Sequence, residues 1–144
     1  MTPRLELFDR QRTVPVPVAQ LNLAANAALD RVLKSRGPGD RVLGGLGSVE
    51  ITFLGDGAMG AVHRRFLGIA GPTDVITFPH GEILIGAGEA VRNARRFKEP
   101  VPRELCRYLV HGLLHLQGFL DTEPRDAATM HRIQERIIAA VWHE

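Results

Sequence analysis

The chain has 144 residues, 44% hydrophobic and 24% charged, with a formal net charge of +2. These values are typical of a globular protein with a real core, and the length fits one domain over residues 1–144. No apolar run approaches the roughly 18–20 residues that span a bilayer, and the N-terminal residues lack a signal-peptide core. The only cysteine, Cys106, has no partner for a disulfide. We therefore expect a cytoplasmic protein.

Strand-like and helix-like segments alternate along the first half of the chain. Residues 5–8 predict a short strand, and the alternating, β-rich residues 48–54 predict a second one. Between them, residues 18–35 predict a helix, because apolar side chains recur on one side: Leu21, Ala24, Leu29, Val32 and Leu33. Asp56 is a candidate cap for a further helix that runs to about Phe66.

The second half of the chain adds two strands and three helices. Residues 74–78 and 82–85 predict strands joined by a tight turn that contains Pro79 and Gly81. Helices are then expected over about residues 88–97, 102–117 and 123–142. We therefore predict an α+β fold, an α/β sandwich in which a small mixed sheet of about four strands is covered by about five helices.

Arginine dominates the basic residues, because 16 of the 18 cationic side chains are Arg. Its planar guanidinium suits phosphate groups. Residues 91–107 carry a local excess of four positive charges, which predicts a surface for a nucleic-acid backbone. A solvated helix face is the more common meaning of such a charge run. Under the first interpretation the RNA-binding residues are Arg92, Arg95, Arg96, Arg103 and Arg107.

The segment HGLLHLQGFLD, residues 111–121, contains a candidate metal site on a helix of the C-terminal half. His111 and His115 are about one helical turn apart, so they project from one face and can bind one ion. Gly118 can end the helix in the left-handed conformation, which lets Asp121 turn back as the third ligand. Three protein ligands with one open position are typical of a catalytic zinc site.

Several alternatives to this interpretation remain. Histidine pairs at this spacing are more often surface or core residues than ligands, and Glu123 and His131 are rival third ligands of lower rank. The residue after His111 is Gly112, where zinc peptidases of the H-E-x-x-H type carry a glutamate base. A peptidase would therefore need a glutamate from elsewhere in the chain.

No general acid or base is evident within the segment itself. The further candidates for a catalytic role are His63, Arg64 and Arg65, on the helix predicted from Asp56 onward, and Asp74, at the start of a strand. Each has a structural alternative, because His63 is also typical of a solvated surface histidine and Asp74 of a turn residue.

Three blocks of the sequence together resemble a known family. HGLLHLQGFLD resembles the signature helix H-G-x-L-H-L-x-G-Y-D-H of the YbeY family, bacterial endoribonucleases that act in ribosomal RNA maturation. AVHRRFLGIAGPTDVITFPHGEILIG is similar to its block L-N-x-x-Y-R-x-x-x-x-P-T-D-V-L-S-F-P followed by G-D-I, and residues 130–135, MHRIQE, are similar to its M-x-x-x-Q-E. The blocks occur in the family's order over roughly the second half of the chain.

This resemblance implies a single-strand-specific, metal-dependent endoribonuclease that acts in 16S ribosomal RNA 3′-end maturation and ribosome quality control. It implies one zinc ion held by His111, His115 and Asp121, with ribosomal RNA and the ribosomal particle as partners and no membrane. The alternatives are another zinc-dependent hydrolase of peptidase-like character, and a non-catalytic RNA-binding factor of ribosome assembly.

Three positions depart from the family's pattern. Asp121 stands where a third histidine is usual, and His63 stands where asparagine is usual. Leu67 replaces an arginine that is a candidate for holding phosphate or the charge of the transition state. Arg64, Arg65 or an arginine of residues 92–107 is then left to take over that role.

Overall fold

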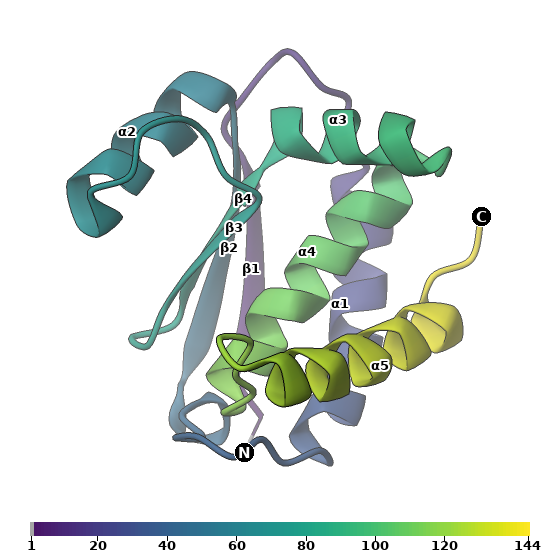
Figure 1. Cartoon of the computed structure of the whole chain (residues 1–144). Helices are drawn as coiled ribbons and strands as arrows, with labels where there is room; N and C mark the ends of the chain where they lie inside the picture. Colours follow the sequence, from purple (N-terminus) through teal and green to yellow (C-terminus); the bar gives the residue numbers. More distant parts are fainter. Residues whose placement is uncertain (1) are drawn as a thin grey trace.

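The computed structural model describes residues 2–144, which form a four-stranded sheet and five α-helices (Figure 1). The strands are β1 (Arg4–Asp9), β2 (Ser48–Leu54), β3 (Val75–Phe78) and β4 (Glu82–Gly86). The helices are α1 (Val18–Leu33), α2 (Asp56–Leu67), α3 (Ala87–Phe97), α4 (Val101–Leu116) and α5 (Pro124–Val141), with a short 3₁₀ helix at Leu43–Gly45. The predicted α+β fold is confirmed.

The sheet is mixed, with the strand order β1–β2–β4–β3. β1 pairs with β2 and β2 with β4 in parallel, whereas β3 runs antiparallel to β4 and forms an edge. Parallel neighbours need a crossover connection. Here α1 connects β1 to β2, and α2 together with β3 lies between β2 and β4.

Helices cover both faces of the sheet. Figure 1 shows α2 on one side of the strands and α1 with α4 on the other, and α5 contacts both α1 and α4. Because successive strand residues point to opposite faces, Ile83 and Ile85 join the larger hydrophobic cluster with α4. Leu84, between them, packs in a smaller cluster with Met59 of α2. Within residues 2–144, no helix has the length and apolar character needed to cross a membrane.

The close approach of α4 to the sheet depends on Gly112. A Cβ atom at this position would lie 2.7 Å from Cγ2 of Ile83 on β4, well inside the ≈ 3.5–4.0 Å that separates carbon atoms in contact. The absence of a side chain at position 112 therefore has a packing reason. It also means that the glutamate base of a peptidase is missing there. It lets the helix that carries His111 and His115 lie directly against β4.

Asp56 differs from its predicted role as a helix cap. The cap position of α2 is Gly55, and no side chain caps the first turn. The Asp56 carboxylate instead binds Arg92 of α3 through two hydrogen bonds of 2.9 Å. Asp56 is the first residue inside α2, one position after the cap, and the two-pronged geometry of the guanidinium gives its carboxylate a bidentate partner in α3.

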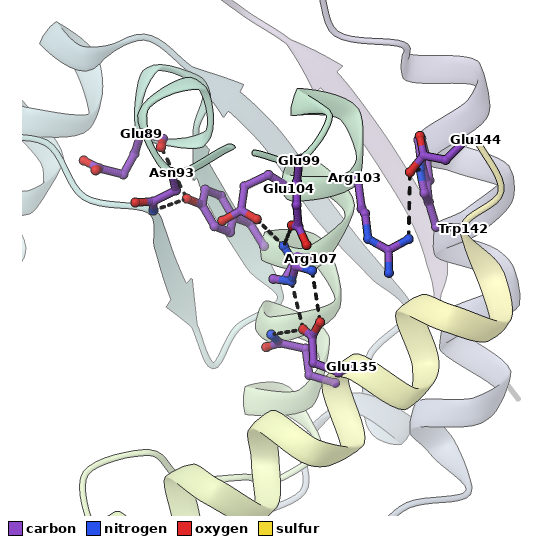
Figure 2. Close-up of polar contacts among 11 residues, drawn as sticks. Glu89, Asn93, Glu99, Arg103, Glu104, Arg107, Glu135, Trp142 and Glu144 are labelled. Atoms are coloured by element: carbon purple, nitrogen blue, oxygen red, sulfur yellow. Dashed lines mark hydrogen bonds and ion pairs between the residues drawn. The ribbon is translucent and has the colours of Figure 1, made fainter. Parts of the chain in front are cut away.

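A network around Arg107 ties α4 to α5. Figure 2 shows its guanidinium between Glu135 of α5 and two other carboxylates, Glu99 and Glu104. The Arg107 side chain is 15% exposed and that of Glu104 6%, whereas Glu99 and Glu135 at the rim are each 32% exposed, so the cluster has a buried centre. Because removing one member of a buried cluster leaves an uncompensated charge, the network holds the two helices in one relative position.

The packing role of Gly112 is testable with alanine. Gly112→Ala is expected to lower the free energy of unfolding by about 1–3 kcal/mol, because the added methyl group overpacks the contact with Ile83. Urea unfolding followed by circular dichroism measures the change.

Gly57 of α2 is the matched control, because a Cβ there meets nothing within 4 Å. Gly57→Ala is expected to be neutral or to stabilise by up to about 1 kcal/mol, since alanine favours helix. Equal effects at the two glycines would contradict the packing explanation.

Candidate metal centre

His111 and His115 lie on one face of α4, and the chain brings Asp121 back to them. Their Nε2 atoms are 3.0 Å apart, and Oδ2 of Asp121 lies 3.3 Å from each. One ligand atom from each of the three residues lies within 4.8 Å of the others, so the group can hold a metal ion. The structure therefore brings together the three residues that the sequence pattern predicted to converge.

Gly118 allows the chain to turn back toward the two histidines after α4. α4 ends at Leu116, and Gly118 has the left-handed φ of +93° that a side chain would disfavour. The loop before β2 supports the turn, because the amide of Gly39 donates to the carbonyl of Gly118 at 2.8 Å. A Cβ on Gly37 would lie 2.2 Å from the Gly118 carbonyl carbon. Glycines on both sides therefore allow the two backbones to meet.

Hydrogen bonds determine which ring nitrogen of each histidine faces the centre. Nδ1 of His111 lies 2.7 Å from Oε1 of Gln134, and Nδ1 of His115 lies 3.0 Å from the carbonyl oxygen of Phe119. The amide nitrogen of Gln134 donates to Glu135 at 3.1 Å, so its oxygen is the atom turned to His111. In the neutral imidazoles both Nδ1 atoms therefore donate, which leaves a lone pair on each Nε2.

Two lone pairs and one carboxylate oxygen then converge on the same point. Such atoms repel one another unless a cation lies between them. Tetrahedral zinc with bonds of about 2.0–2.1 Å separates its ligand atoms by roughly 3.3–3.4 Å, close to the 3.0–3.3 Å seen here. Burial lowers the pKa of His111, as does the neighbouring His115, which keeps the imidazole unprotonated near neutral pH. The donor set fits a divalent ion of the zinc type.

Two cavities flank the centre and leave it accessible. A groove of about 660 Å³ contains His115 in its wall and runs beside β3, the edge strand. A second cavity of about 420 Å³ is lined by His111 and Asp121 on the other side. The Asp121 side chain is 43% exposed, so the metal position is open to a substrate.

The other candidates for catalysis occupy different places. Asp74 lines the second cavity, and its Oδ1 accepts the amide of Val75 at 2.7 Å at the start of β3. His63 binds the carbonyl oxygen of Gly71 at 2.9 Å and so connects α2 to the following loop. Arg64 and Arg65 are exposed in the last turn of α2, and neither they nor His63 lines either cavity.

The structure also shows where the alternative third ligands, Glu123 and His131, and the substituted position, Leu67, lie. His131 lines the second cavity, and Glu123 is exposed just before α5. Within residues 2–144, neither belongs to the group that can hold a metal. Leu67 lines the groove that contains His115. The position where the family pattern has arginine therefore lies in the same groove as His115, but it is apolar in this chain.

Much of the predicted arginine patch is neutralised by the protein itself. Arg92 binds Asp56 and Glu89, and Arg103 lies 3.8 Å from Glu144. Arg107 binds three carboxylates of the protein and joins α4 to α5, and its role as an RNA contact stays a prediction. The local charge count could not include acids from α2 and α5, which lie far away in the chain.

Two other arginines of that patch are exposed. Arg95 and Arg96 lie in the last turn of α3 without an ion pair in the part of the chain that the structure describes. Binding of RNA by these two residues stays a prediction.

A cationic cavity of about 380 Å³ was missed from the sequence. Four exposed cations from α1, the loop after it and α5 line it together with Phe119: Arg31, Lys34, Arg36 and Arg136. No carboxylate lines this cavity within residues 2–144. Phe119 connects it to the metal centre, because its carbonyl oxygen accepts the bond from His115.

Gln134 is a second feature of the site that the sequence analysis did not identify. It lies in the segment MHRIQE that carries part of the family resemblance, so the motif was the available signal. Its function as the partner of His111 needed the packing of α5 on α4.

Fold and site together define an α+β protein with an accessible group of two histidines and one aspartate that can hold a metal ion. The family model for "Endoribonuclease YbeY" matches residues 6–141. The chain belongs to the YbeY family of endoribonucleases.

Individual relatives agree with this assignment. An endoribonuclease YbeY of Chlorobium phaeovibrioides is 34% identical over 98 residues, 63% of this chain and 66% of the relative. That of Anaeromyxobacter sp. is 35% identical over 64% of this chain and 53% of its own length. That of Moorella thermoacetica is 31% identical over 80% of this chain and 85% of its own length. The match thus spans just over half to most of these relatives.

A solved structure has the same fold. The solution structure of TM1509 from Thermotoga maritima superposes with a TM-score of 0.65 at 23% sequence identity. The similarity covers 96% of this chain and 89% of that chain.

The bond from Gln134 predicts a measurable effect on metal binding. Gln134→Leu removes the acceptor that holds the His111 ring, so affinity for Zn²⁺ is expected to fall about 10- to 100-fold. Gln134→Glu keeps an acceptor oxygen and is expected to retain most of the affinity. Competition with a chromogenic chelator measures both, and Gln20→Leu on the exposed face of α1 is the control. Unchanged affinity in Gln134→Leu would refute the orienting role.

Proposed function

We propose that this chain is a metal-dependent endoribonuclease that cleaves single-stranded RNA and uses one zinc ion held by His111, His115 and Asp121. The observation that carries this proposal is the convergence of the two Nε2 atoms of His111 and His115 and a carboxylate oxygen of Asp121 at an accessible position. Membership of a family of endoribonucleases supports RNA as the substrate.

The chain's own residues determine how a substrate meets this centre. Gln134 and the Phe119 carbonyl orient the two imidazoles, and burial keeps His111 neutral. A bound zinc ion supplies a Lewis acid that activates water and polarises a phosphate oxygen. The exposed Asp121 leaves room at one side of the centre, where a phosphodiester can enter from either flanking cavity.

Other hydrolase chemistry has less support. A peptidase of the H-E-x-x-H type needs a glutamate at position 112, which here is a glycine packed against Ile83. Cys106 offers no nucleophile, because burial raises the pKa of its thiol to about 12. The peptidase-like alternative therefore lacks the usual base at position 112, and Cys106 does not provide a thiol nucleophile.

The cellular substrate that we propose is ribosomal RNA, at the 3′ end of the 16S molecule, on the ribosomal particle in the cytoplasm, with a role in ribosome quality control. This finer assignment rests on the resemblance of the three sequence blocks to the YbeY pattern. The unpaired, buried Cys106 is compatible with a reducing compartment.

A non-catalytic RNA-binding factor of ribosome assembly is the second candidate, and one observation favours it. Leu67 puts an apolar side chain into the groove where the family pattern has arginine. Under this alternative the metal mainly joins α4 to the turn that carries Asp121. Removal of the metal would then unfold the protein, whereas under the catalytic proposal it abolishes cleavage and leaves the fold.

Substitution of the three ligands tests the catalytic proposal. His111→Ala, His115→Ala and Asp121→Ala are each expected to lose bound zinc and to lower cleavage of a fluorescent single-stranded RNA by about 100-fold or more. Zinc content and initial cleavage rates are the measurements, and His143→Ala, at an exposed histidine near the C-terminus, is the control. Full zinc content and cleavage in His111→Ala would refute the proposal.

The cationic cavity is proposed to receive the RNA backbone, because it gathers four positive side chains next to the Phe119 turn. Each phosphate contact that is lost lowers the slope of log affinity against log salt by about 0.7 for a single strand. Arg136→Ala is therefore expected to reduce this slope, measured by fluorescence anisotropy. Arg4→Ala, which removes an exposed cation of β1, is expected to leave it unchanged.

The same titration tests the arginines predicted from the sequence. A reduced slope for Arg95→Ala with an unchanged slope for Arg136→Ala would favour α3 as the backbone surface and contradict the cavity.

A further inference from the structure

We propose that the groove beside His115 binds an unpaired nucleobase adjacent to the phosphate at the metal centre. This inference rests on the proposed function and names the part of the RNA that the site recognises. The base groove is defined by residues of the end of α2, of β3, of α4 and of the segment after α4: Phe66, Leu67, Val75, Phe78, His115 and Leu120.

The groove has the size and lining of a site for a small aromatic group. Its volume of about 660 Å³ lies within the ≈ 300–1,000 Å³ of ligand pockets, which are mostly apolar with a few polar groups. Polar side chains in its lining are those of Asp40, Thr77 and His115. A flat base with polar edges matches this combination.

Aromatic rings stand at one wall of the groove. The rings of Phe66 and Phe78 meet edge to face at 5.3 Å, and Phe78 stacks on His80 at 5.5 Å. Phe66 and Leu67 are both 56% exposed, so each presents a large apolar surface to solvent. Proteins that bind single strands use such aromatic side chains as platforms for bases.

The residues around the groove indicate which kind of molecule it binds. His115 belongs both to the groove and to the metal centre, so a group bound in the groove is next to the cleaved bond. Arg64 and Arg65 follow one another on the last turn of α2, exposed and without a carboxylate partner within residues 2–144. The guanidinium of Arg65 lies 5.4 Å from the Phe66 ring centroid. Cations beside an aromatic wall suit a base attached to phosphates.

An extended peptide is the competing occupant, because the groove runs along β3, an edge strand that can accept another strand. Two observations favour RNA over a peptide. The exposed Arg64 and Arg65, next to Phe66 in the chain, outnumber the single carboxylate that lines the groove, Asp40. The shared His115 connects the groove to a centre suited to phosphate. A base must also be unstacked to enter, so the groove gives a physical reason for single-strand selectivity.

The experiment compares two oligonucleotides of equal charge on the zinc-loaded protein. One is a 2′-O-methyl oligouridine of about 12 nucleotides, within the site sizes of single-strand binders, and the other is its fully abasic counterpart. Gel analysis verifies that the 2′-O-methyl strand stays intact during the measurement. Anisotropy of a fluorescent label measures affinity for wild type, Phe66→Ala, Phe66→Trp and Phe97→Ala.

Wild type is expected to bind the oligouridine more tightly than the abasic strand. Phe66→Ala is expected to weaken oligouridine binding about 5- to 100-fold and abasic binding less than about 2-fold, since stacking acts only on bases. Phe66→Trp is expected to restore binding. Phe97→Ala is the matched control, because Phe97 is 63% exposed at the end of α3 and does not line the groove.

Three results would overturn the inference. They are equal binding of both strands by wild type, an equal loss for both strands in Phe66→Ala, and displacement of the oligouridine by an extended peptide rich in valine and threonine. Cleavage is measured separately on unmodified RNA. Absent cleavage with intact Phe66-dependent binding contradicts the proposed function and supports base binding, whereas cleavage with base-independent binding contradicts only the groove.

Discussion

The contact between α4 and β4 at Gly112 is the constraint on which the rest of the site depends. A helix that also carries the ligands can lie this close to the sheet only where a side chain is missing. The contact sets the height of His111 and His115 above the strands. The Gly118 turn and the loop before β2 then bring Asp121 to the same point. The geometry of the centre is thus a consequence of backbone packing.

The second support of the centre comes from α5. Arg107 and Glu135 join this helix to α4, and Gln134, next to Glu135, holds the His111 ring. The chain of bonds from Arg107 through Glu135 and Gln134 ends on an imidazole nitrogen. One polar network therefore combines the packing of two helices with the orientation of a ligand, which explains why an arginine is buried so near a site suited to anions.

The basic side chains consequently fall into two groups with different roles. Arg92 and Arg107 bind carboxylates of the protein, whereas the cations around the Phe119 turn and at the end of α2 remain exposed. The proposed path for RNA follows the exposed set, with the metal centre between a cationic cavity and an apolar groove. In this arrangement phosphates and a base are recognised on different sides of the bond to be cleaved.

The sequence by itself determined the secondary structure, the α+β class and the three converging residues at the centre. Those features follow from local rules: periodicity along strands and helices, one helical turn between His111 and His115, and a glycine that ends the helix. Tertiary structure alone decided the partner of Asp56, the neutralisation of Arg107 and the role of Gln134. It also gathered the cations of α1 and α5 into one cavity. The reason is that these contacts join residues far apart in the chain, where spacing carries no information about distance in space.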